Sequence, residues 1–421
     1  MNNIVQLCVS KMFTNILLDI QENWLLYCAM PLVAAAIGYI TKLLAIKMMF
    51  SPIKFIGIKP YLGWQGIVPR KAEYMANIAC ETLTKNLIKP QEIWERLDHR
   101  VLLSELEKPL SKAVENMTEE IVSTYYPSLW QVLPKAVKTK LTLRVQQQVP
   151  TLSHRIVTEL GENLETVFDL KDMIVKALTT DKRVIIKIFK ETGREEFVFI
   201  RRTGIYFGFI IGVVQAITWA LTHSPWVMPL FGGFVGFFSD WLALKMVFRP
   251  LEEKKFFGVW SWQGLFLKRR LEVCEIHAQL IAEEVLTVPN LVDAIISGPA
   301  SDRLFNLVHR YIEEMIDEQA GYLRPVLVYS MGSQNYIEMK KQITQKMIGQ
   351  LPEMTQHIEP LLASQLDIKN ELSSKMKLMT LEQFEGLLRP VFQQDEKILI
   401  ILGGILGFLV GELQVYIMLH H

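Results

Sequence analysis

The residues of this chain that are most able to take part in chemistry are ionisable and polar groups inside long apolar runs. Lys42 and Asp240 stand in two such runs, and Gln215, Gln414 and Glu412 stand in two others. An ionisable residue within a membrane span is energetically costly, so it is usually paired or functional. Because Lys42 and Asp240 carry opposite charges at equivalent places in two similar segments, we expect one salt bridge between them. The alternative is a proton or ion path through these five residues.

The sequence offers no motif for catalysis or for a bound cofactor. It contains no GxSxG elbow, no P-loop and no Rossmann fingerprint. Its four cysteines form no CxxC-like pair and its eight histidines are scattered, so neither a disulfide framework nor a zinc site is expected. The sequence therefore predicts a protein that is not an enzyme and that holds no metal or cofactor.

The net charge of the chain indicates which classes of binding partner are expected. The chain has 45 Lys and Arg residues against 44 Asp and Glu residues, which gives a formal net charge of +1. Nucleic-acid binders usually carry a clear basic excess, so no nucleic acid is expected. Hydrophobic residues make up 50% of the chain, and some windows hold no charge while others are dense in it. This segregation is typical of a membrane protein with large water-exposed parts.

Two segments that directly follow apolar runs combine tryptophan with basic side chains. Each has a Trp-Gln-Gly triplet and, a few residues later, a pair of basic residues. Tryptophan favours the membrane–water interface, and basic side chains can hold lipid phosphates. The candidate headgroup residues are Trp64, Gln65, Arg70, Lys71, Trp262, Gln263, Arg269 and Arg270.

The elements that must position these residues are four membrane spans. A spanning helix needs about 20 apolar residues. The run from Thr203 to Ser239 holds no Asp, Glu, Lys or Arg and is too long for one span, so it is divided at the polar turn 222–225. The spans are therefore predicted at residues 24–50, 203–221, 226–248 and 397–419.

The segments outside the spans are predicted to be helical. Residues 1–23 have the apolar spacing of an amphipathic helix that lies on the membrane or packs on the first span. Residues 51–202 and 249–396 are predicted to form two arms of amphipathic helices, with β alternation only around Phe197–Ile200. Either the apolar stripes of the arms pack on each other, which is favoured, or they line a groove for acyl chains or a partner's helix.

The sequence also repeats itself. Gly38–Pro52 matches Gly236–Pro250 at a constant offset, which places Asp240 at the position of Lys42. Each repeat holds a span, an arm and a second span, so two parallel copies around an axis along the membrane normal are expected. Small residues four apart let helix backbones approach closely. The second and fourth spans, or the first and third, are expected to contact through the faces of Gly204, Gly208, Gly212, Gly403, Gly407 and Gly411.

The predicted fold class is thus an all-α membrane protein with four transmembrane helices and two long amphipathic helical arms, internally duplicated in parallel. Gly38–Pro52, with the following Gly63–Lys71 and with Gly204–Gln215, resembles the bacterial membrane family called domain of unknown function 445. The second copy departs from that motif, with Asp240 at the place of Lys42. The resemblance implies a mostly helical protein of a bacterial inner membrane, and it supplies no catalytic residues.

Together these patterns predict a non-enzymatic protein of bacterial envelope maintenance. It would act as a scaffold or as a lipid-handling or lipid-transport device that uses the apolar faces of its arms. The expected partners are membrane phospholipids, with a homo-oligomer or an envelope protein as further options. A small-solute or ion transporter is the alternative. Basic residues gather beside the arm ends of the spans, so the positive-inside rule places both arms in the cytoplasm, with arms outside it as the other possibility.

Overall fold

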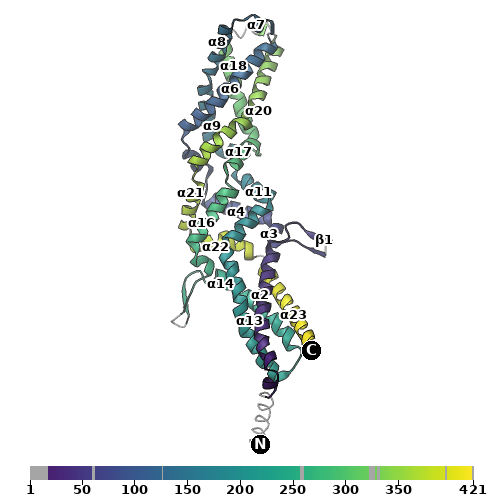
Figure 1. Ribbon diagram of the computed structural model, residues 1–421. Helices are drawn as coiled ribbons and strands as arrows, with labels where there is room; N and C mark the ends of the chain where they lie inside the picture. Colours follow the sequence, from purple (N-terminus) through teal and green to yellow (C-terminus); the bar gives the residue numbers. More distant parts are fainter. Residues whose placement is uncertain are drawn as a thin grey trace. The chain divides into compact units, whose positions relative to one another are not determined.

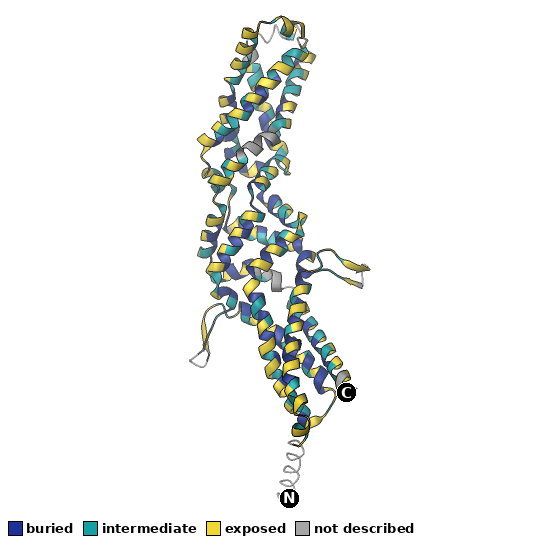
Figure 2. Ribbon diagram, viewed as in Figure 1, coloured by how far each residue is buried: buried dark blue, intermediate teal, exposed yellow. Residues whose placement is uncertain are grey.

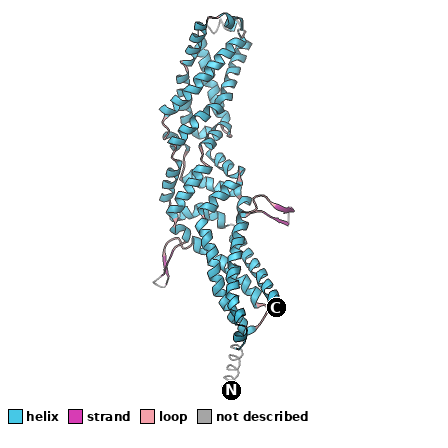
Figure 3. Cartoon of the chain, in the orientation of Figure 1, coloured by secondary structure: helices cyan, strands magenta, loops and turns pink. Residues whose placement is uncertain are grey.

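The structure is a computed structural model, and it describes residues 18–58, 62–125, 127–256, 260–321, 328–329, 332–393 and 396–419. Most of these residues are helical (Figure 3). The chain divides into two compact units. Unit 1 contains Met1–Ile78, Asp181–His277 and Ser373–His421, and unit 2 contains Ala79–Thr180 and Ala278–Leu372. The helix predicted at residues 1–23 lies largely outside the described residues, which begin at Leu18.

Unit 1 is built on four long apolar helices (Figure 1). They are α2 (Trp24–Phe50), α13 (Arg194–Thr222), α14 (Val227–Phe248) and α23 (Glu396–Leu419). Each contains a segment long and apolar enough to cross a membrane, which confirms the prediction of four candidate spans. Large apolar side chains such as Leu32, Ile210 and Leu409 are exposed on these helices, and Figure 2 shows exposed positions along this helical bundle. A surface of this kind suits a lipid environment, because apolar area is costly in water.

Helix α13 begins at Arg194, well before the span start predicted at residue 203. Its first turn contains Glu195 and Glu196, and acidic side chains stabilise a helix N-terminus through the helix dipole. The β alternation expected around Phe197–Ile200 is therefore wrong. These residues are helical, and Phe197 and Ile200 are buried at the helical spacing of three.

The glycine faces join spans within each half of the chain. A Cβ added to Gly204 of α13 would lie 2.3 Å from the carbonyl oxygen of Gly38 in α2. A Cβ added to Gly407 of α23 would lie 2.1 Å from the carbonyl oxygen of Gly232 in α14. The expected contact of the second and fourth spans, or of the first and third, through these faces is wrong. The first span pairs with the second and the third with the fourth, because α2 and α14 carry the complementary small residues.

Two short β-hairpins interrupt the helical pattern, one after each of α2 and α14. Strand β1 (Ile56–Ile58) pairs antiparallel with β2 (Leu62–Trp64), and β3 (Lys254–Phe256) pairs antiparallel with β4 (Trp260–Trp262). The registers correspond, because Ile56 lies opposite Trp64 and Lys254 lies opposite Trp262. The arms are therefore not entirely helical, and strands of three residues are too short for an alternation of period two to identify them.

Shorter helices complete unit 1. They are α3 (Ile67–Arg70), α12 (Lys182–Thr192), α15 (Leu265–Lys268) and α22 (Leu381–Gln393). Helix α12 begins after Asp181, whose carboxylate accepts a hydrogen bond from the backbone N–H of Arg183 and so caps the first turn. Three further helices extend along the chain from one unit into the other, namely α4 (Ala72–Asn86), α16 (Arg270–Glu284) and α21 (Ile368–Leu378).

Unit 2 is composed of helices from both arms. The first arm supplies α5 (Pro90–Glu95), α6 (His99–Tyr125), α7 (Pro127–Val132), α8 (Lys135–Gln146), α9 (Val149–Glu162), α10 (Leu164–Val167) and α11 (Leu170–Thr180). The second arm supplies α17 (Val288–Ser297), α18 (Ser301–Ala320) and α20 (Ser333–Gln365). Helices α5 and α9 begin with a proline in the first turn, where the missing N–H has no intrahelical partner to lose.

The core of unit 2 lies between the arms. Leu110 and Met117 of α6 belong to one buried cluster with Leu304 and Ile312 of α18 and with Met347 of α20. The apolar stripes of the two arms therefore pack on each other, as the favoured interpretation predicted. Burial of such side chains contributes about 1.5–3 kcal/mol each, so this cluster is a main source of stability for unit 2.

The glycine contacts lead to a direct test. Replacing Gly407 with Ala puts a methyl group against the carbonyl oxygen of Gly232, so α14 and α23 must separate. We expect a loss of about 1–3 kcal/mol, as for other overpacked sites, seen as a lower thermal midpoint in detergent micelles. The matched control is Gly349→Ala on α20, where the added Cβ meets open space. That variant gains up to about 1 kcal/mol from helix propensity, and equal losses in both variants would contradict the proposed packing.

Candidate functional site

The predicted salt bridge is present in unit 1. Lys42 of α2 places its Nζ 2.6 Å from Oδ1 of Asp240 in α14, and the same Nζ donates to Oγ of Ser239 at 3.1 Å. The exposed fraction is 0% for Lys42 and 6% for Asp240. The protein itself therefore shields both charges, before any lipid is considered.

Two glycines make room for this pair. A Cβ on Gly204 would lie 2.8 Å from Cδ of Lys42, and a Cβ on Gly403 would lie 1.9 Å from Oδ2 of Asp240. All four spanning helices thus meet around one ion pair. Oδ2 of Asp240 is buried and has no hydrogen-bond partner among the described residues, so Lys42 provides the main compensation for this carboxylate.

The other intramembrane polar residues do not join the pair in the described part of the chain. Gln215 is buried and its Nε2 donates to Sδ of Met228 at 2.7 Å. Gln414 is half-buried and Glu412 is exposed. A small hollow of about 30 Å³ beside Lys42 and Asp240 is walled mainly by apolar side chains. This arrangement favours a structural role for the pair over a path for ions.

The Trp-Gln-Gly segments close the bases of the two hairpins. Nε2 of Gln65 donates to the carbonyl oxygen of Ile53 at 2.7 Å, and Nε2 of Gln263 donates to that of Leu251 at 2.9 Å. The indole N–H of Trp64 donates to the carbonyl oxygen of the α2 residue Met48 at 3.2 Å. These glutamines therefore stabilise the chain reversal after each span, a role that their spacing alone did not reveal.

The second basic pair already has protein partners. Arg269 donates to Oε1 of Glu196 at 3.0 Å and to both carboxylate oxygens of Glu272 at 2.8 and 3.0 Å. The hydrogen bond with Glu272 contributes most to raising the pKa of Arg269. Arg270 donates to the carbonyl oxygens of Met379 and Lys377. The headgroup role stays a prediction for Arg269 and Arg270, and equally for Arg70, which is exposed, and Lys71, which is half-buried.

Unit 2 contains an apolar cavity of about 200 Å³. Helices of both arms line it, and Ser153 and Trp94 are the described lining residues whose side chains carry a polar atom. The first arm contributes Trp94 and Leu106, and the second contributes Ile295 and Leu362. Gly161 admits the wall residue Trp94, because a Cβ there would lie 2.3 Å from the indole Nε1. The sequence suggested a groove for acyl chains, but it did not identify these residues.

The ion pair leads to a prediction on stability. Lys42→Met leaves the carboxylate of Asp240 buried without its cation, and Asp240→Asn leaves the ammonium group of Lys42 without its anion. We expect each change to cost about 3–5 kcal/mol, the range for breaking a buried pair. The measurement is the thermal midpoint of purified protein in detergent, followed by tryptophan fluorescence.

Two variants control for this experiment. Lys42→Met/Asp240→Leu removes both charges and should recover most of the loss, because no uncompensated charge remains. Lys47→Met changes an exposed lysine of the same helix and should leave the midpoint nearly unchanged. A double variant no more stable than the single ones would show that unpaired charge is not the cause.

Comparison with known proteins relates the chain to bacterial membrane proteins. It is 24% identical over 181 residues to a UPF0754 membrane protein of Nostoc sp., covering 37% of this chain and 42% of that protein. It is 36% identical over 77 residues to one of Microcystis aeruginosa, covering 18% of each, and 33% identical over 98 residues to one of Bacillus pumilus, covering 23% of this chain and 26% of that protein.

These alignments span less than half the length of each of the three relatives. No family model matches the chain, so the resemblance to domain of unknown function 445 stays a prediction. No solved structure matches it either. The chain is a membrane protein and, over part of its length, a distant homologue of the UPF0754 membrane proteins.

Proposed function

We propose that this protein is a non-enzymatic, lipid-handling protein of the bacterial inner membrane, and that unit 2 binds an acyl chain. The observation that carries the proposal is the apolar cavity between the helices of the two arms. Its lining is almost entirely hydrocarbon, so it has almost nothing to offer a polar solute or an ion. An alkyl chain matches it, because a hydrocarbon ligand leaves no polar group unsatisfied there.

The energetic cost of an empty cavity supports an occupant. Protein interiors are close-packed and contain few voids larger than a water molecule. The hollow is partly open to solvent, so its apolar wall meets water when it is empty, and covering that wall contributes about 25 cal/mol per Å² of apolar area. An acyl chain would supply the missing contacts.

The surrounding core is suited to a ligand of variable shape. Met117 and Met347 are buried in the cluster beside the cavity, and Met315 packs against it. Leu110, Leu304 and Val308 belong to both the cluster and the cavity wall. Methionine is unbranched and adapts to irregular space, so the core behind this wall can adjust to acyl chains of different length or saturation.

We further propose that the chain arose by duplication and that both arms lie in the cytoplasm. Matching hairpins, matching glycine contacts and the repeated Trp-Gln-Gly triplets support the duplication. The basic residues Lys54, Arg201, Arg249 and Lys268 near the arm ends of the spans support the orientation under the positive-inside rule. Phospholipids are the proposed partners, and a homo-oligomer or an envelope protein is compatible with a scaffold role.

Acyl-chain binding is tested with a photoactivatable diazirine palmitate on the full chain in detergent. We expect crosslinks within residues 90–110 and 291–308, which carry part of the cavity wall. Ile295→Trp fills the cavity and should lower crosslinking about tenfold, equivalent to about 1.4 kcal/mol of binding free energy. The matched control is Ile316→Trp, which changes the same core away from the cavity lining. Equal crosslinking in Ile295→Trp and wild type would refute the site.

Topology is tested by labelling introduced cysteines with a membrane-impermeant maleimide. The background carries Cys8→Ser and Cys28→Ser, because Cys28 is exposed whereas Cys80 and Cys274 are buried. We expect Val132→Cys and Gly349→Cys in the arms to react only in inside-out vesicles. Thr222→Cys at the C-terminal end of α13 should react in intact spheroplasts. Arm labelling in intact spheroplasts would overturn the orientation and favour a lipid conduit outside the cytoplasm.

A further inference from the structure

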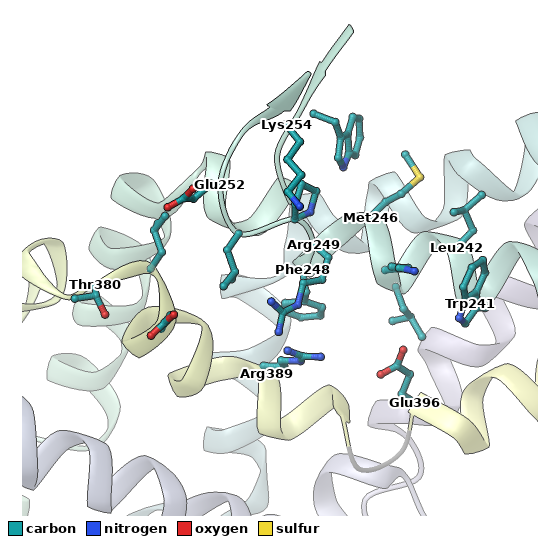
Figure 4. A pocket seen from close by; sticks show the side chains of 17 residues that line it. Trp241, Leu242, Met246, Phe248, Arg249, Glu252, Lys254, Thr380, Arg389 and Glu396 are labelled. Carbon is teal, nitrogen blue, oxygen red and sulfur yellow. The ribbon is translucent and has the colours of Figure 1, made fainter. Parts of the chain in front are cut away.

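A second hollow lies in unit 1, beside the adjacent ends of α14 and α23. This interface pocket has a volume of about 1150 Å³, and its lining includes Trp241, Lys245, Arg249, Lys254, Arg389 and Glu396. Figure 4 shows Arg249 and Arg389 near its centre, Glu252 and Thr380 toward one end, and Trp241 and Leu242 toward the other. Typical small-molecule sites occupy about 300–1,000 Å³, so this pocket can hold a sizeable headgroup.

The centre of the interface pocket carries excess positive charge. Arg249 and Arg389 both bond to Oε1 of Glu385, at 3.3 Å and 2.5 Å. The side chain of Glu385 is 8% exposed, so its carboxylate is held beneath the two guanidinium groups. One carboxylate cannot neutralise two guanidinium groups, so one positive charge remains for an external anion.

Three further donors surround this centre. Nζ of Lys245 lies 4.9 Å from the centroid of the Trp241 ring. Neither Lys245 nor Lys254 has a carboxylate within salt-bridge distance among the described residues. The indole N–H of Trp262, another lining residue, is buried without an acceptor in the described part of the chain. A phosphate would satisfy several of these donors at once.

The pocket also carries separate negative positions. Glu252, Glu382 and Glu396 line it, and none of them has a basic side chain within salt-bridge distance among the described residues. A ligand that is only anionic would leave these carboxylates uncompensated. A zwitterion with a phosphate and a nearby ammonium group matches both sets of charges.

Part of the remaining wall is apolar and belongs to a candidate span. Trp241, Leu242 and Met246 of α14 line the pocket close to the arm end of that helix, where lipid tails meet headgroups. We infer that the interface pocket binds a glycerophospholipid whose headgroup carries a primary ammonium group, as in phosphatidylethanolamine. The phosphate lies among the cations, the ammonium lies toward Glu252 and Glu382, and the acyl chains run along α14.

This inference goes beyond the acyl-chain cavity and does not rest on it, because the two sites are built from different residues of different units. It is tested by native mass spectrometry of the full chain in mild detergent. The lipids are phosphatidylethanolamine, phosphatidylglycerol and phosphatidylcholine with identical acyl chains. We expect phosphatidylethanolamine to bind about tenfold more tightly than the other two, a difference of about 1.4 kcal/mol. Equal or tighter binding of either other lipid by the wild type overturns the inference without any variant.

Variants assign the selectivity to the pocket. Lys245→Gln/Lys254→Gln should weaken phosphatidylethanolamine binding about tenfold. The matched control, Lys47→Gln/Lys255→Gln, removes two exposed lysines from the corresponding end of α2 and the adjacent position of β3 and should retain binding. Glu252→Gln/Glu382→Gln should abolish the preference over phosphatidylcholine, whose quaternary ammonium cannot donate a hydrogen bond. An equal loss in the lysine control refutes the pocket.

Ile295→Trp separates this site from the cavity of unit 2. It should retain the headgroup preference, because Ile295 does not line the interface pocket. Loss of that preference in Ile295→Trp would mean that the selectivity arises at the cavity and would overturn the assignment to the interface pocket. Loss of palmitate crosslinking with the preference intact would leave the interface pocket supported.

Discussion

The buried ion pair between Lys42 and Asp240 constrains the whole arrangement of spans in unit 1. Separating the two charges inside the protein would leave each without compensation, at a cost of several kcal/mol. A slip of one helical turn is about 5.4 Å, which exceeds the 2.6 Å that separates Nζ from Oδ1. Helices α2 and α14 therefore have one favourable register, and packing by glycine alone would not discriminate so strongly.

The same pair explains why glycine is required at two places. Gly204 leaves space for the stem of Lys42, and Gly403 leaves space for the carboxylate of Asp240. The close approach of α13 to α2, and of α23 to α14, is thus coupled to the burial of charge. If the proposed duplication occurred, two identical copies would have met with like charges at this position. Under the same proposal, the opposite charges of Lys42 and Asp240 would reflect divergence of the two halves.

Sequence reasoning succeeded where one local signal was strong. The spans were predicted because each contains a long run without charged residues. The ion pair was predicted because Lys42 and Asp240 have few other charged partners available within the spans. It failed for the glycine faces, because the choice of partner depends on small residues of α2 and α14 as well as on Gly204 and Gly407 themselves. The two hairpins were not predicted, because strands of three residues are too short to show the alternation of apolar and polar residues that identifies a strand. The apolar cavity could not be read from spacing, since its walls come from segments as distant as Trp94 and Leu362.

The two hollows differ in the chemistry that they can recognise. A phospholipid is amphipathic, and binding of its headgroup and of its chains makes opposite demands on a protein. The interface pocket offers charges of both signs at a span end, and it can discriminate headgroups at little desolvation cost because it is open to water. The cavity of unit 2 offers hydrocarbon and can discriminate only by size and shape, which is worth about 1–3 kcal/mol per methylene. Headgroup identity would therefore be decided in unit 1, whereas unit 2 would accept many lipids that share a suitable chain.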